Sequence, residues 1–140
     1  MAISTIHIQA ESKNLTIIMD KFEDTINVDI RLFKELFDNF LSNAVKFSPQ
    51  GKTIYIGSIK KENELILYVK DEGPGIHPDE HIKLFTRFGK LSARPTGGEK
   101  STGLGLAITK QIAKVLDCRV WCESELGKGA TFFVSVTQEP

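Results

Sequence analysis

An amphipathic helix set among strand-like stretches is the feature that most constrains the fold of this chain. Over residues 29–47, large apolar residues recur every three or four positions, which is typical of a helix with one buried face. Asp29 or Asn27 can cap its start, and the run 48–51 contains the proline and glycine that end it. A second apolar stripe predicts another long helix over 104–116.

Alternating apolar residues predict three pairs of strands. These pairs are 6–8 with 15–19 around a polar turn at 11–14, 53–59 with 64–70, and 119–124 with 131–136. A short helix is expected over 78–88, and a mobile lid over 89–102, where periodicity is lost. Because few connections are long enough for parallel crossovers, we expect an α+β fold: a two-layer α/β sandwich, with a mixed, mostly antiparallel sheet and helices on one face.

The composition fits a single domain over residues 1–140. Hydrophobic residues make up 41% of the chain and charged residues 26%, which is enough apolar material for a core. The 18 basic residues balance the 18 acidic ones, so no surplus positive field attracts a polyanion, and we expect no nucleic-acid partner. The apolar runs are far shorter than the ~18 residues of a membrane span, and no signal peptide is evident, so we expect a cytoplasmic domain.

The two cysteines are expected to be reduced. Cys118 and Cys122 lie four residues apart in a strand-like run. At about 3.3 Å per residue, their Cα atoms would be ~13 Å apart, too far for a disulfide. No histidine lies at a ligand spacing from them, so packing in the core is favoured over a metal site.

A polar line on the first helix is one candidate site. Asn39, Asn43 and Lys46 are spaced i, i+4 and i+7 and border the apolar stripe, which predicts that they line the rim of a cleft. Asparagine is a poor helix-interior residue, and its amide oxygen suits a hard cation, with a lysine close enough to neutralise phosphate. A solvated polar flank of the helix would give the same spacing, so both interpretations stay open.

Two glycine-containing segments are further candidates. Asp71 ends a strand and is followed by Gly73 and Gly75, which would let the backbone approach a flat ligand while the carboxylate accepts from an exocyclic amine. A tight turn would use the same residues. The second segment, 102–106, opens a helix, where amides and the helix dipole bind phosphate. A glycine-containing cap is the alternative, but two glycines in a first helical turn cost ~2 kcal/mol against alanine, which favours close backbone approach to a ligand. The segment matches neither the P-loop nor the dinucleotide fingerprint, so a different nucleotide fold is required.

In this order and at these separations, the segments resemble the catalytic, ATP-binding domain of sensor histidine kinases, which has the Bergerat fold. Residues 31–48 resemble the asparagine box of that family, and 71–76 resemble its first glycine box. Residues 84–88 resemble its phenylalanine box, and 101–106 its second glycine box. The similarity runs from about residue 11 to 136, and four motifs in order make it specific.

The resemblance implies a role for each candidate residue. Asn43, helped by Asn39, would hold Mg²⁺ on the triphosphate of ATP, and Lys46 would meet phosphate charge. Asp71 would accept the adenine amine, supported through water by Thr131. The other nucleotide-binding residues would be Phe47, Gly73, Gly75, Ile76, Lys90, Thr102, Gly103, Leu104, Gly105 and Leu106. Relatives often carry arginine at the position of Lys90, which lacks the bidentate fork of arginine.

Asn39 stands where ATP-hydrolysing relatives of this fold carry a glutamate that activates water. An amide cannot act as that general base, so the resemblance implies transfer of the γ-phosphoryl group to another group. In this family the acceptor is a histidine on a preceding helical dimerisation domain, and none of His7, His77 and His81 has that context.

We therefore expect a fragment that binds nucleotide, autophosphorylates little or not at all on its own, and is monomeric. Its partners would be the histidine-bearing dimerisation domain of the same kinase and the receiver domain of a response regulator. The full-length protein would be a homodimer, and any membrane anchor would lie in segments outside this sequence.

Two other functions remain compatible with the sequence. A serine kinase of the anti-sigma-factor type has the same fold, and an acceptor phosphorylated at serine would identify it. A nucleotide-sensing or protein-binding module without catalysis is the other, and failure to bind Mg-ATP would support it. The presence of Asn43, Asp71, Gly103 and Gly105 argues against such a loss of catalysis.

Overall fold

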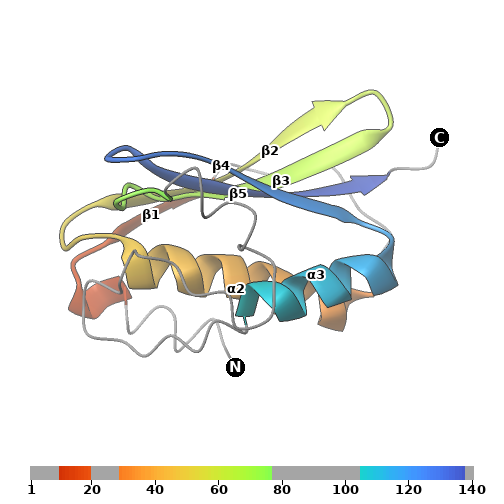
Figure 1. Cartoon of the computed structure of the whole chain (residues 1–140), viewed down its shortest axis with the longest axis horizontal. Coiled ribbons are helices and arrows are strands. Elements are labelled where there is room, and N and C mark those ends of the chain that lie inside the picture. The colour runs from red at the N-terminus through yellow and green to blue at the C-terminus, as the bar shows by residue number, and fades with distance from the viewer. Residues whose placement is uncertain (1–9, 20–28, 77–104, 138–140) are drawn as a thin grey trace.

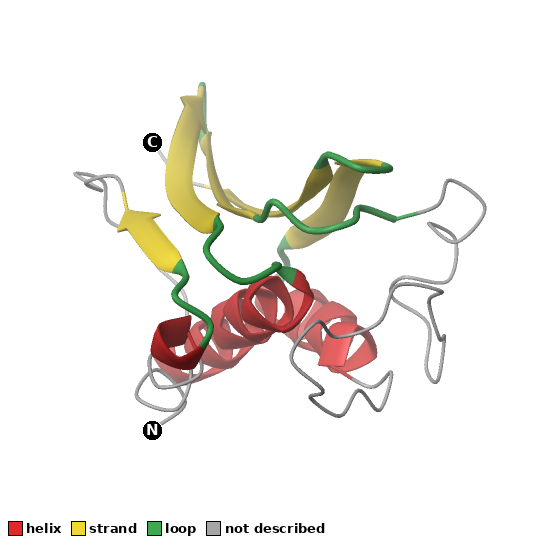
Figure 2. Ribbon diagram, turned by 90° about the vertical axis from the view of Figure 1, so that its left-hand side faces the viewer, coloured by secondary structure: helices red, strands yellow, loops and turns green. Residues whose placement is uncertain are grey.

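A computed structural model of the chain describes residues 10–19, 29–76 and 105–137 (Figure 1). The described residues form two layers, a five-stranded sheet and helices that cover one of its faces (Figure 2). The elements are β1 (Thr16–Met19), α2 (Ile30–Phe47), β2 (Thr53–Lys61), β3 (Glu64–Lys70), α3 (Gly105–Leu116), β4 (Arg119–Glu125) and β5 (Gly129–Thr137). The helix expected over 78–88 and the lid expected over 89–102 lie outside the described residues.

The strand order of the sheet is β1-β2-β3-β5-β4. Only β1 and β2 pair in parallel, and the other three pairings are antiparallel. The predicted mixed, mostly antiparallel sheet and the two later hairpins are therefore confirmed. The first of these hairpins turns more tightly than expected, through residues 62–63 alone, and Glu62 adopts a left-handed φ of 44°.

The start of the chain differs from the expected hairpin loop. Residues 10–12 form a helical turn, which Leu15 N–H closes by donating to Ala10 O at 3.0 Å, and Asn14 follows with a left-handed φ of 54°. The strand that follows pairs with β2, in register from Thr16 opposite Thr53. Its proposed partner, residues 6–8, lies outside the described residues.

The helix α2 begins and ends where the sequence predicts. Asp29 caps it, because its carboxylate accepts from the N–H groups of Arg31 and Leu32 at 3.0 and 3.4 Å. Its apolar stripe packs on the inner face of the sheet, where the rings of Phe40 and Phe132 lie 5.4 Å apart. This packing fixes the distance between α2 and β5, the two elements that border the site.

Both cysteines are free in the structure. Cys118 and Cys122 pack against the core but are half-buried. Among residues 10–19, 29–76 and 105–137, no cluster of histidine, cysteine and acidic side chains could hold a metal ion. No helix within these ranges is long and apolar enough to cross a membrane.

Candidate functional site

A cleft opens between the last turns of α2 and the loop that follows β3. Its volume is about 370 Å³, open solvent at the mouth included. Its walls are mostly apolar, with one carboxylate and one amide among them. The lining residues are Asn43, Phe47, Asp71, Pro74, Gly75, Ile76, Leu106, Ala130 and Phe132.

The carboxylate of Asp71 is the most constrained polar group of the cleft. The residue is only 4% exposed, and its Oδ1 accepts from Gly73 N–H at 2.9 Å and from Ala130 N–H at 3.2 Å. Burial raises the pKa of Asp71 from 3.8 to about 6, although the two backbone N–H groups lower it. Among the described residues, no donor reaches Oδ2. The carboxylate is therefore held by one oxygen and can accept from a ligand with the other.

The glycines after Asp71 are required by packing within the protein. A Cβ on Gly73 would lie 2.6 Å from the carbonyl oxygen of Phe47, the last residue of α2. Gly75 has a left-handed φ of 76°, and a Cβ there would collide with the carbonyl of Glu125. The loop is thus pressed between α2 and the end of β4, and this packing is what shapes the cleft wall.

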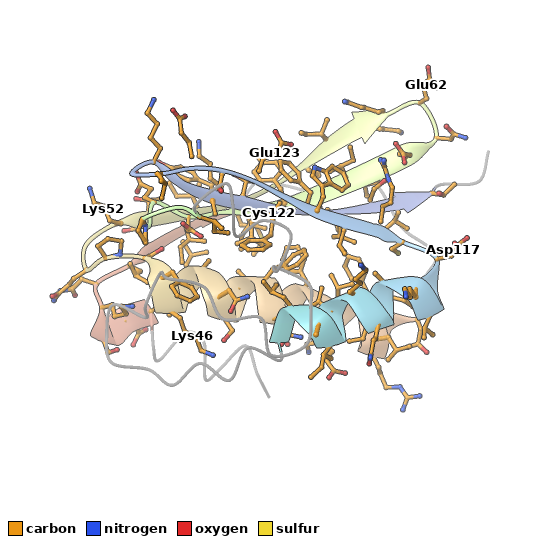
Figure 3. The ribbon with its side chains drawn as sticks, in the orientation of Figure 1. Lys46, Lys52, Glu62, Asp117, Cys122 and Glu123 are labelled. Carbon is orange, nitrogen blue, oxygen red and sulfur yellow. The ribbon has the colours of Figure 1, made fainter. Side chains whose placement is uncertain are left out.

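The two asparagines of α2 lie one helical turn apart and are both half-buried. Asn43 lines the cleft, whereas Asn39 faces α3, where its Nδ2 donates to Thr109 Oγ1 at 3.3 Å. Lys46 is half-buried and lies outside the cleft lining; its side chain extends from α2 away from the sheet (Figure 3). The expected polar line on α2 is therefore present, but Asn43 borders the cleft whereas Asn39 borders α3.

Thr131 is not among the residues that line the cleft. Its neighbours Ala130 and Phe132 line the cleft, so strand alternation directs the Thr131 side chain to the other face of the sheet. The contact from β5 to Asp71 is made by the backbone N–H of Ala130 instead. Support of Asp71 by Thr131 through a water molecule stays a prediction.

Of the other predicted residues, Phe47, Gly75, Ile76 and Leu106 line the cleft, and Gly105 begins α3. Lys90, Thr102, Gly103 and Leu104 lie outside the described residues.

Three contributors to the site were missed by sequence reasoning. Lys13 is 8% exposed, and its Nζ donates to Val45 O at 2.8 Å and to Lys46 O at 3.1 Å, which supports the last turn of α2. Gly129 has a φ of 100°, and a Cβ there would collide with the carbonyl of Asp71. The third is the buried hydroxyl of Thr109. Each acts through a contact between segments that are distant in sequence, and no local sequence pattern predicts such a contact.

The chain is similar in sequence to proteins of a known family. Residues 28–140 match the family described as Histidine kinase-, DNA gyrase B-, and HSP90-like ATPase. The chain is 40% identical over 103 residues to Cyanobacterial phytochrome A of Nostoc, covering 73% of this chain and 13% of that protein. It is 38% identical over 108 residues to Sensor protein SrrB of Staphylococcus aureus, covering 77% of this chain and 18% of that protein. The chain thus spans less than a fifth of the length of these relatives.

Solved structures show the same fold. The mycobacterial sensor histidine kinase MprB has a TM-score of 0.84 at 21% identity, over 99% of this chain and 94% of that one. The catalytic domain of histidine kinase ThkA has a TM-score of 0.80 at 21% identity, over 99% and 90% of the two chains. Full-length ShkA in complex with AMPPNP has a TM-score of 0.80 at 24% identity, over 99% and 29%. These likenesses confirm the predicted two-layer fold.

The raised pKa of Asp71 predicts a pH-dependent stability. The carboxyl of Asp71 binds a proton more tightly in the folded protein than in the unfolded chain. Its contribution to the free energy of unfolding is therefore fully present below about pH 4 and is lost as pH rises through about 6. A rise of about two pH units is worth about 3 kcal/mol. We expect the free energy of unfolding of the wild type, relative to Asp71→Asn, to fall by about this amount between pH 4 and 7.5 in urea titrations. A difference in unfolding free energy between wild type and Asp71→Asn that stays constant from pH 4 to 7.5 would contradict a raised pKa of Asp71.

Proposed function

This chain belongs to the histidine kinase-, DNA gyrase B- and HSP90-like ATPase family as a histidine kinase catalytic domain, and from this premise we propose that it binds Mg-ATP in the cleft. We further propose that it transfers the γ-phosphoryl group to a histidine on a separate dimerisation domain. The observation that carries the proposal is Asp71, a buried carboxylate with one oxygen held by two backbone amides at the base of an apolar cleft.

The cleft fits the chemistry of an adenine ring. A purine has flat, apolar faces and an exocyclic amine, and it needs apolar walls with one acceptor in the plane of the ring. Phe47 and Ile76 supply walls, and Oδ2 of Asp71 supplies the acceptor. Because Oδ1 is already fixed by two hydrogen bonds, little freedom is lost when the amine binds.

The rim of the cleft fits a metal-bridged phosphate chain. Asn43 lines the cleft and Asn39 lies one helical turn earlier on α2, and their amide oxygens would be suitable ligands for Mg²⁺. Two neutral amides without a carboxylate bind such a cation weakly, so most of its ligands would be phosphate oxygens and water, and it would bind together with the nucleotide. When bound, Mg²⁺ neutralises charge on the phosphate chain.

The remaining phosphate contacts are assigned from the resemblance. Lys46 follows Asn43 by one turn and would add positive charge near the phosphates. The amides at the start of α3, from Gly105, would face phosphate oxygens at the positive end of the helix dipole. We assign the same role to Lys90, Thr102, Gly103 and Leu104.

Transfer is favoured over hydrolysis because Asn39 carries an amide where a hydrolase needs a base. Phosphoryl transfer requires little proton chemistry from the protein, and positioning with charge neutralisation supplies most of the rate. The acceptor would be a histidine on the dimerisation domain of the same kinase, within a homodimer. A receiver domain of a response regulator would then accept the phosphoryl group.

Asp71→Asn is predicted to weaken ATP binding at least tenfold, or about 1.4 kcal/mol, because one amide oxygen must replace a carboxylate and the NH₂ group opposes the adenine amine. Isothermal titration calorimetry at pH 7.5 measures the change. Asp117→Asn is the matched control, because Asp117 is exposed beyond the far end of α3 and asparagine tolerates its left-handed φ of 57°. An unchanged affinity in Asp71→Asn would remove the adenine assignment.

Asn43→Asp is predicted to lower phosphotransfer at least tenfold (~1.4 kcal/mol), because it places a new negative charge beside the phosphate chain. The measurement mixes the chain with a histidine-bearing dimerisation domain and radiolabelled ATP in Mg²⁺. Asn63→Asp, in the exposed β2–β3 turn, is the control. Phosphohistidine is acid-labile, so an acid-stable label would indicate a serine acceptor and contradict the proposal, as would full activity in Asn43→Asp.

A further inference from the structure

Thr109 presents a hydroxyl where a helix of this kind normally buries an apolar side chain. The residue lies in the middle of α3, on the stripe that faces the core, and its exposed fraction is 0%. A buried hydroxyl lowers stability unless it is hydrogen-bonded, and a valine would fill the same volume without that requirement. The hydroxyl therefore needs an explanation beyond packing.

The hydroxyl has a partner on α2. Oγ1 of Thr109 accepts from Nδ2 of Asn39 at 3.3 Å. A helical threonine can donate to the carbonyl one turn earlier while its lone pairs accept from elsewhere, which suits it to this acceptor role. The bond joins the two helices that border the cleft, because Asn43 lines the cleft one turn after Asn39 and Leu106 lines it one turn before Thr109.

The direction of this hydrogen bond fixes the orientation of the Asn39 amide. The group is planar, with nitrogen and oxygen on opposite sides of its carbon, so a donated Nδ2–H turns Oδ1 away from Thr109. With an apolar side chain at position 109, this restraint on the amide is removed, and an orientation that offers nitrogen in place of oxygen becomes less unfavourable. A metal ligand needs the oxygen.

We propose that Thr109 is a positioning residue, whose hydroxyl holds Asn39 with the amide oxygen presented to Mg-nucleotide. This inference rests on the proposed function and extends it, because it assigns to α3 a part in metal recognition. A hydrogen bond that only joined two helices would affect the stability of the fold and would leave metal dependence unchanged.

The test compares AMPPNP affinity in Mg²⁺ with affinity in EDTA, by calorimetry, for the wild type, Thr109→Val and Thr109→Ser. Valine keeps the shape of threonine and removes the hydroxyl, whereas serine keeps the hydroxyl. We expect Thr109→Val to reduce the gain in affinity due to Mg²⁺ by roughly 5-fold, with the affinity in EDTA unchanged. Thr109→Ser should keep the full gain, and Asn39→Ala should lose as much as Asn39→Ala combined with Thr109→Val.

A second measurement does not depend on nucleotide. The side-chain NH₂ resonances of Asn39, followed in ¹⁵N–¹H spectra, should shift in Thr109→Val and stay in place in Thr109→Ser. Thermal unfolding of each variant establishes that it is folded at the temperature of measurement.

Three results would overturn the inference. One is an undiminished Mg²⁺ gain in Thr109→Val, and another is an equal loss of affinity with and without Mg²⁺. The third is an Asn39 NH₂ signal that is insensitive to Thr109→Val. Failure of the wild type itself to bind AMPPNP in Mg²⁺ would instead overturn the proposed function, and this inference with it.

Discussion

The two hydrogen bonds to Oδ1 of Asp71 are the interaction on which the rest of the site depends. An isolated buried carboxylate is too costly to keep ionised, and two backbone N–H groups lower that cost without neutralising the charge. One donor belongs to the loop after β3 and the other to β5, so the same carboxylate ties the loop to the sheet. The remaining oxygen keeps its capacity to accept, and its strength as an acceptor is greater because water is excluded.

The shape of the cleft follows from how α2 meets that loop. Gly73 allows the loop to approach the carbonyl of Phe47, and Lys13 holds the carbonyls of Val45 and Lys46 from the other side. A lysine ammonium near the last carbonyls of a helix also complements the negative end of its dipole. The last turn of α2 is thereby fixed between two segments that are distant in sequence, and its side chains are positioned before any ligand arrives.

The features of the fold and the cleft that the sequence predicts are those governed by local patterns. The bounds of α2 follow from its apolar period and from the capping carboxylate of Asp29, and the later hairpins follow from alternation around short turns. The sequence predicts Asn43 and Asp71 as site residues because an asparagine inside a helix and a carboxylate before glycines are both unusual in their local setting. The resemblance to a known family implies that both bind one nucleotide, and in the structure both line one cleft.

The parts that the sequence did not predict depend on register and on long-range packing. The alternation of a strand has a period of two, so an assignment displaced by one residue exchanges the faces of the sheet, and the contact of Ala130 with Asp71 is therefore hard to predict from sequence. The parallel pairing of β1 with β2 and the bond between Asn39 and Thr109 join segments with no local signature of each other. The packing of Gly73 against the carbonyl of Phe47 likewise depends on a contact between distant segments.

The most direct test of the central claim is a crystal structure of the chain with AMPPNP and Mg²⁺. Adenine is expected in the cleft, with its exocyclic nitrogen within about 3.2 Å of Oδ2 of Asp71, and the phosphate chain is expected to be directed toward Asn43. A nucleotide bound elsewhere, with the cleft closed by its own side chains, would contradict the account.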